Sequence, residues 1–70
     1  MTVTLQRAIA TAEQQANGRA VSADIRQERG TVRIEVEVAG PQGVKTVLVD
    51  AQSGLVTATH AGGQDDDDQD

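Results

Sequence analysis

A nine-residue stretch near the middle of the chain, residues 31–39 with the sequence TVRIEVEVA, constrains the fold more than any other segment. Its aliphatic side chains fall on one parity and its charged side chains on the other: Val32, Ile34, Val36 and Val38 against Arg33, Glu35 and Glu37. Strict period-two alternation in β-branched residues is typical of a strand with one buried face. We therefore expect a central β-strand whose aliphatic side must be covered by another element.

The covering element is expected at the N-terminal end of the chain. Apolar residues recur at helical spacing over residues 5–16, and polar residues occupy the opposite side. Thr4 is a suitable N-cap, with Val3 before it as a hydrophobic staple onto Ala8. Asn17-Gly18 ends the helix, and Gly18 is expected to adopt the left-handed conformation. The small side chains of the stripe favour close packing on a sheet: Leu5, Ala8, Ile9, Ala12 and Ala16.

Three more segments are predicted to be strands, at residues 20–28, 44–49 and 55–60. In the first of them, the side chains expected to face inward are those of Val21, Ala23 and Ile25. In the second we expect Val47 and Val49 to face the helix and Leu48 to lie on the outer side. In the last, the inward residues are expected to be Val56 and Ala58. The turns between strands are predicted at Arg29-Gly30, at residues 40–43 and at residues 50–54, where Asp50 caps the loop and Gly54 is left-handed.

These elements predict an α+β fold in which one N-terminal helix packs on one face of an antiparallel meander of three to four strands, in the order α-β-β-β(-β). Seventy residues correspond to a single domain, which we place at residues 1–61. Residues 62–70 carry a run of aspartates and nothing that could be buried, so we expect a disordered acidic tail. Because the core must be built from small aliphatic residues, the domain is expected to be marginally stable and to gain from self-association or a partner.

Composition excludes several classes of function. The net charge of −5 comes from the tail, because the six acids of the body balance the six bases. A neutral body without a single aromatic residue argues against nucleic-acid binding, which requires a basic surface and often stacking side chains. The absence of cysteine excludes disulfides and thiolate metal sites. No apolar run is long enough to span a membrane, and the first residues lead directly into the predicted helix without a signal peptide.

No set of residues indicates catalysis, a cofactor or a metal centre. His60 is the only histidine, and it has neither an evident nucleophile nor further ligands at workable spacing. Glu35 and Glu37 share one strand face, where pairing with arginines on the neighbouring strands is favoured over an acid–base pair. The aspartates of the tail could attract divalent cations, but ligands that are not held in place bind weakly and without selectivity.

The outer side of the predicted sheet is the best candidate for a protein partner. It would carry a mixed patch of charged and apolar side chains: Arg26, Arg33, Glu35, Glu37 and Leu48. Leu48 and Leu55 are both expected on this side and would leave an apolar strip without cover. Such a strip, or an unpaired edge strand, also favours a homodimer.

Four segments of the chain follow one another in a recognisable order and spacing. They are residues 5–12 (LQRAIATA), Gly18 followed by Val21-Ser22-Ala23, residues 30–38 (GTVRIEVEV) and residues 47–56 (VLVDAQSGLV). In this order they resemble the first helix, the first strand, the central strand and the closing hairpin of the PepSY domain. The likeness covers residues 4–59. The family often has tyrosine in the central strand where this chain has Ile34, so a role for a tyrosine hydroxyl does not carry over.

The resemblance implies a function without chemistry. PepSY domains occur in the propeptides of secreted zinc metallopeptidases and in exported or membrane-anchored bacterial proteins, where they are thought to bind or restrain peptidases. It therefore implies an exported, periplasmic or extracellular protein that inhibits a peptidase or aids its folding; a cytoplasmic location is the alternative. The alternative functions are a structural domain that forms a homodimer and weak cation binding through the tail.

Overall fold

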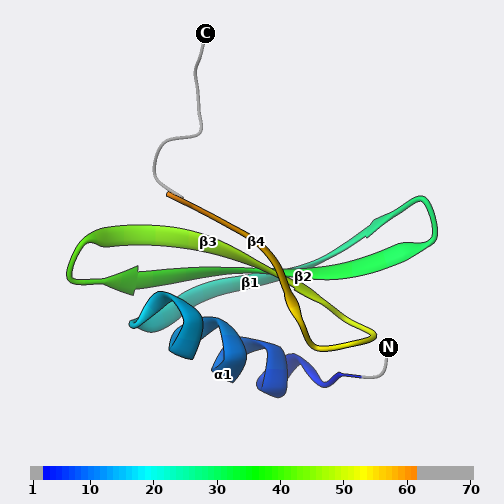
Figure 1. Cartoon of the computed structure of the whole chain (residues 1–70), viewed down its shortest axis with the longest axis horizontal. Coiled ribbons are helices and arrows are strands. Elements are labelled where there is room, and N and C mark those ends of the chain that lie inside the picture. The colour runs from blue at the N-terminus through cyan, green and yellow to red at the C-terminus, as the bar shows by residue number, and fades with distance from the viewer. Residues whose placement is uncertain (1–2, 62–70) are drawn as a thin grey trace, which may run out of the picture.

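The computed structural model describes residues 3–61, which form one helix followed by four strands. Helix α1 spans Leu5–Ala16, and the strands are β1 (Arg19–Glu28), β2 (Thr31–Gly40), β3 (Gly43–Asp50) and β4 (Val56–Ala61). Neighbouring strands are antiparallel and follow the order β1-β2-β3-β4, with α1 across one face of the sheet (Figure 1). The predicted α+β class is confirmed, with four strands. The predicted acidic tail at residues 62–70 lies outside the described residues.

The core lies between α1 and the helix-facing side of β2 and β3. Its largest fully buried side chains all come from the alternating parity of these two strands: Ile34, Val36, Val38, Val47 and Val49. The helix contributes three buried alanines, Ala8, Ala12 and Ala16. A helix with so little side-chain volume on its buried side can lie close to the sheet. Leucine is not part of the buried core, and Leu5 and Leu55 are 39% and 67% exposed.

Both ends of α1 are capped, but the C-terminal cap differs from the prediction. The Thr4 hydroxyl accepts a hydrogen bond from the Arg7 backbone N–H at 3.1 Å, as expected of an N-cap. The left-handed residue at the other end is Asn17, with φ 55° and ψ 57°, and not Gly18. Gly18 is needed for a different reason, because a Cβ there would collide with the Ala39 carbonyl oxygen and lie 2.9 Å from Val38 Cγ1.

Strand β1 contains a bulge that shifts its parity. Ala20 pairs with Val38 and Ser22 pairs with Glu37, so Val21 is an extra residue without a partner on β2. Val21 is 61% exposed, and the helix-facing side of β1 consists of Ala20, Ala23, Ile25 and Gln27. The prediction that Val21 belongs to this side was therefore wrong.

Strand β4 contains a second irregularity of the same kind. Val56 pairs with Val49, whereas Ala58 pairs with Leu48, so Thr57 is the extra residue. Residues opposite one another in an antiparallel pair point to the same side of the sheet. Ala58 therefore lies on the side away from the helix, together with Leu48, and its predicted inward position was wrong. The outward position of Leu48 is confirmed.

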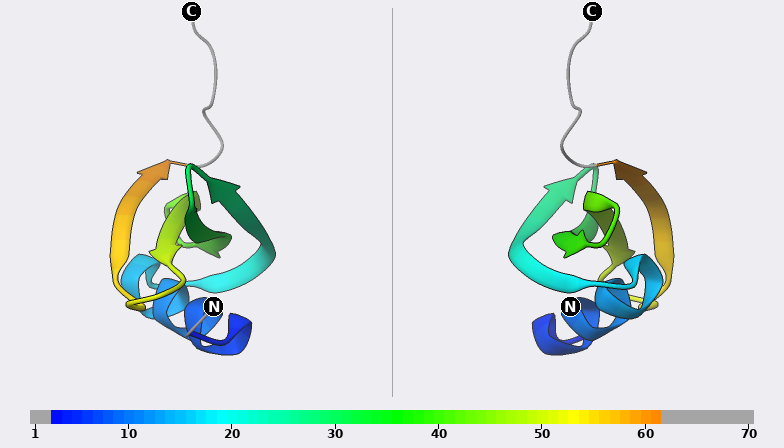
Figure 2. Two further views of the ribbon diagram at one scale, coloured as in Figure 1. Left: turned by 90° about the vertical axis from the view of Figure 1, so that its right-hand side faces the viewer. Right: turned by 90° about the vertical axis from the view of Figure 1, so that its left-hand side faces the viewer.

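The sheet is strongly twisted. The β1–β2 turn and the end of β4 both curve away from α1, at opposite ends of the molecule (Figures 1 and 2). Arg29 and Gly30 in that turn have φ of 53° and 80°, the left-handed pair that matches the twist of a two-residue hairpin. Since β1 is an edge strand and its far end curves away from the helix, Ile25 is 56% exposed although it belongs to the helix-facing side.

Candidate functional site

The face of the sheet that points away from α1, here called the outer face, carries all five residues predicted as a partner surface. Their register partners place them side by side: Arg26 is opposite Arg33, Glu35 is opposite Leu48, and Glu37 is opposite Thr46. The alternate residues of β2, Ile34, Val36 and Val38, are buried on the helix side. The alternation of β2 and its register with β1 and β3 therefore bring the predicted residues of three strands to one surface.

Contacts between neighbouring strands hold several of these charged side chains in place. Arg26 Nη1 lies 3.1 Å from Glu35 Oε1, and Arg33 Nη1 lies 3.7 Å from Glu28 Oε1. The Ser22 hydroxyl donates a hydrogen bond of 3.0 Å to Glu37 Oε1. Pairing of Glu35 with an arginine across strands was predicted and is confirmed. These contacts fix where the charges lie, whereas exposed ion pairs of this kind contribute at most about 1 kcal/mol to stability.

The part of the outer face formed by β3 and β4 carries fewer charged side chains than the part formed by β1 and β2. Leu48 is half-buried there and lies between Glu35 on β2 and Ala58 on β4. Thr46, two residues before Leu48, is only 7% exposed and lies between Glu37 and His60. Sequence reasoning did not include Thr46 in the surface, although its parity with Leu48 on β3 could have indicated it.

The outer face is acidic. By register it carries five acids (Asp24, Glu28, Glu35, Glu37 and Asp50) and three arginines (Arg19, Arg26 and Arg33), which gives it a net charge of about −2. The body of the chain as a whole is neutral, so this imbalance arises from how the sheet sorts its side chains. A surface of this charge favours a partner with a basic patch.

Asp50 lies at the border of this face, and its side chain caps the β3–β4 loop. Its carboxylate accepts hydrogen bonds from the backbone N–H groups of Gln52 and Ser53, at 2.7 and 3.0 Å. These two hydrogen bonds lower the pKa of Asp50 below its usual value of 3.8, and the bond from Ser53 has the larger effect. The positive charge of Arg33 adds a smaller effect in the same direction. Gly54, with φ 79°, closes the loop as predicted. Asp50 is therefore a structural carboxylate that stays ionised.

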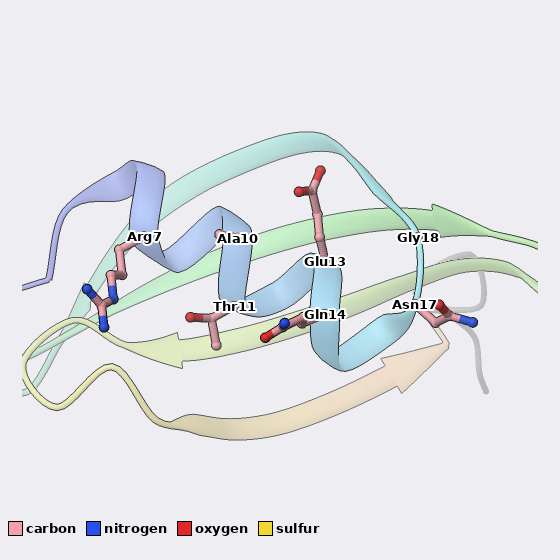
Figure 3. Close-up of a pocket in the computed structure, with 7 residues that line it drawn as sticks. All are labelled: Arg7, Ala10, Thr11, Glu13, Gln14, Asn17 and Gly18. Carbon is pink, nitrogen blue, oxygen red and sulfur yellow. The ribbon is translucent and has the colours of Figure 1, made fainter.

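A shallow hollow runs along the solvent side of α1, and it does not have the features of a binding site. Figure 3 shows that Arg7, Thr11 and Gln14 point to one side of the helix and Glu13 points to the other. The Glu13 side chain already has a hydrogen-bond partner within the chain, because its Oε2 accepts a hydrogen bond from the Ala20 backbone N–H at 2.8 Å. The polar groups of this hollow do not converge on a common point.

Within residues 3–61, histidines and acids do not form a cluster of three or more that could hold a metal ion. His60 is exposed near the end of β4, opposite Thr46 on the outer face. No helix in the part of the chain that the structure describes is long and apolar enough to cross a membrane.

Comparisons of the chain with protein-family models, with curated proteins and with solved structures found no match. The likeness to the PepSY domain therefore depends on the segments quoted above.

Proposed function

We propose that this chain is a non-catalytic module that binds another protein through the outer face of its sheet. The observation that carries the proposal is the arrangement of that face, where Arg26, Glu35 and Glu37 are held by contacts between strands beside a half-buried Leu48. Charged side chains held in place next to a less polar area are the two components that protein interfaces combine. Because the outer face carries five acidic residues and three arginines, it favours a partner that presents basic side chains.

The resemblance to the PepSY domain supports a class of partner. On that basis the partner is an exported peptidase, which the module restrains or helps to fold, and the protein itself is exported. The fold is compatible with such a role, because a helix-backed sheet leaves one face free for docking.

Titration of a secreted zinc metallopeptidase with the purified protein tests this proposal. We expect inhibition, or faster refolding of the denatured peptidase, that weakens as salt is raised because the proposed contact is electrostatic. The variant Glu37→Lys should weaken the effect at least tenfold. Gln14→Lys combined with Gln15→Lys adds the same positive charge on the exposed side of α1 and should leave the effect unchanged.

Two results would contradict the proposal. One is a peptidase whose activity and refolding do not change up to millimolar protein. The other is an effect that the helix variant weakens as much as Glu37→Lys, because the outer face would then have no special part in it.

A second candidate function, self-association, is favoured by a different observation, namely the exposed Ile25 on the edge strand β1.

A further inference from the structure

Strand β1 forms one edge of the sheet. It pairs only with β2, and residues 22–28 continue in register after the bulge at Val21. Its helix-facing side presents Ile25 at 56% exposure, and its outer side presents Asp24 and Arg26. An exposed edge of this length can pair with a further strand.

The backbone groups available on this edge can be assigned from the hairpin. The two-residue turn closes on Glu28 and Thr31, which makes this pair hydrogen-bonded. Hydrogen-bonded and non-hydrogen-bonded pairs alternate along an antiparallel ladder. The backbone N–H and C=O groups of Ala23, Ile25 and Gln27 therefore point away from β2, toward the open edge.

One antiparallel register pairs the whole of residues 22–28 with a second copy and places opposite charges together. Opposite residues in such a pair share a face, so the two-fold axis must pass midway between a residue and its own copy. An axis at Asp24 or Arg26 would place like charges opposite one another, and an axis at Ala23 would require the bulged Val21 to pair. An axis at Gln27 would leave only residues 26–28 to pair, because β1 ends at Glu28. An axis at Ile25 places Ile25 against its copy on the helix side and Asp24 against Arg26 of the second copy on the outer side.

The same register resolves an electrostatic imbalance within one copy. Asp24 lies directly opposite Glu35, a pair of like charges, and among residues 3–61 it takes part in no ion pair. Arg26 of a second copy would lie opposite Asp24 in a non-hydrogen-bonded pair, where side chains are closest. This would occur twice, because the axis repeats every contact.

We propose that two copies of this chain pair antiparallel through β1, with the two-fold axis at Ile25, to form a continuous eight-stranded sheet. About six main-chain hydrogen bonds join the copies, from the pairs Ile25–Ile25 and Ala23–Gln27. Both helices lie on one side of the extended sheet, and the two outer faces form one surface on the other. The inference does not depend on binding of a peptidase through the outer face, since it uses the edge of the sheet; it gives the register for the second candidate function, self-association.

The opposite edge, β4, offers less to a second copy. It has six residues, and Thr57 interrupts its register with β3. No residue beyond this bulge is a large aliphatic one, because the strand ends in Ala58, Thr59, His60 and Ala61.

Single-cysteine variants of the full chain test the register, because the natural sequence has no cysteine. In the proposed dimer the two Ile25 Cα atoms are about 5.5 Å apart, within the range of a disulfide. Ile25→Cys should therefore give a covalent dimer on mild oxidation. Ala23→Cys and Gln27→Cys, each alone, should not, because the copies of either residue are about 13 Å apart. A mixture of these two variants should cross-link to each other.

Charge reversal tests the ion pairs by light scattering across a dilution series. Asp24→Arg places arginines opposite one another between copies and should raise the dissociation constant about tenfold or more. Combining it with Arg26→Asp should restore the dimer, because the ion pairs between copies then re-form with their charges exchanged. Within each copy of this double variant, the new arginine faces Glu35 and the new aspartate faces Arg33, so neither is left opposite a like charge. Gln14→Lys combined with Gln15→Lys, on the exposed side of α1, makes the same change in charge away from β1. This control should leave the dissociation constant unchanged.

Two results would overturn the inference. One is a chain that remains a monomer at millimolar concentration. The other is equal cross-linking of all three cysteine variants, because the register around Ile25 would then not be the one that pairs the copies.

Discussion

Gly18, between α1 and β1, provides the sharpest test of how the helix joins the sheet. The sequence pattern assigns this glycine to a left-handed helix end, whereas the structure gives that conformation to Asn17. At Gly18 the constraint is steric, because an added Cβ would meet the backbone of Ala39 and Val38 Cγ1. The two explanations predict different effects of Gly18→Ala and Gly18→Asn.

The cost of Gly18→Ala can be estimated from these contacts. Inserting a methyl group into a filled space costs about 1–3 kcal/mol, and here backbone must move, because the Ala39 carbonyl carbon would lie 2.9 Å from the new Cβ. Reduced freedom of the unfolded chain returns about 0.4–1 kcal/mol. We expect a net loss of about 1–2 kcal/mol, a large part of the roughly 3–9 kcal/mol that a domain of this size has.

Urea unfolding followed by far-UV circular dichroism measures this loss, since the chain has no aromatic residue for fluorescence. Gly18→Asn should be at least as destabilising as Gly18→Ala, because both add a Cβ. If the left-handed conformation were the constraint, asparagine would be clearly better than alanine. Gly30→Ala is the matched control for conformational strain alone, since Gly30 has φ 80° and open space around it. An alanine variant at Gly18 as stable as the natural chain would refute the reasoning.

Three further predictions concern the core, the helix cap and the loop. Val36→Ala should lower the free energy of urea unfolding by about 2 kcal/mol, because Val36 is fully buried, whereas Val21→Ala at the exposed bulge should change it by less than about 0.5 kcal/mol. Thr4→Ala should cost about 1 kcal/mol in the same assay through loss of the hydrogen bond from Arg7, and Thr4→Ser should retain most of it. The pKa of the Asp50 carboxyl, measured by NMR, should lie below 3.8. Because this pKa is lower in the folded than in the unfolded protein, ionised Asp50 contributes fully to stability above its unfolded-state pKa. That contribution is lost as the pH falls through its folded-state pKa. Asp50→Asn should abolish that part of the pH dependence, and a titration above 3.8 would contradict the loop hydrogen bonds.

Much of the fold could be predicted because its signals are local. The alternation of β2 identifies the core residues Ile34, Val36 and Val38 without knowledge of any neighbour, because a strand repeats every two residues. Asp50 and Gly54 specify their loop by hydrogen bonds and φ values within the loop itself. The five residues of the predicted partner surface share a face for the same reason.

The bulges could not be predicted, and they changed the faces of individual residues. Val21 and Ala58 were assigned inward by counting along their own strands, but each strand contains one residue more than its neighbour can pair with. A bulge is a property of two strands together, so the count along one strand cannot reveal it. The burial of Thr46 and the exposure of Ile25 likewise depend on the twist of the whole sheet.

The sequence by itself determined the helix, the strands, their turns and the two-sided character of the sheet, because each depends on residues within a few positions of one another. Only the tertiary structure decided that Gly18 is constrained by contact with β2, that the outer face is acidic, and that β1 presents Ile25, Asp24 and Arg26 at an open edge. These features arise from the register and twist that bring distant strands together, and neither is encoded within a single segment.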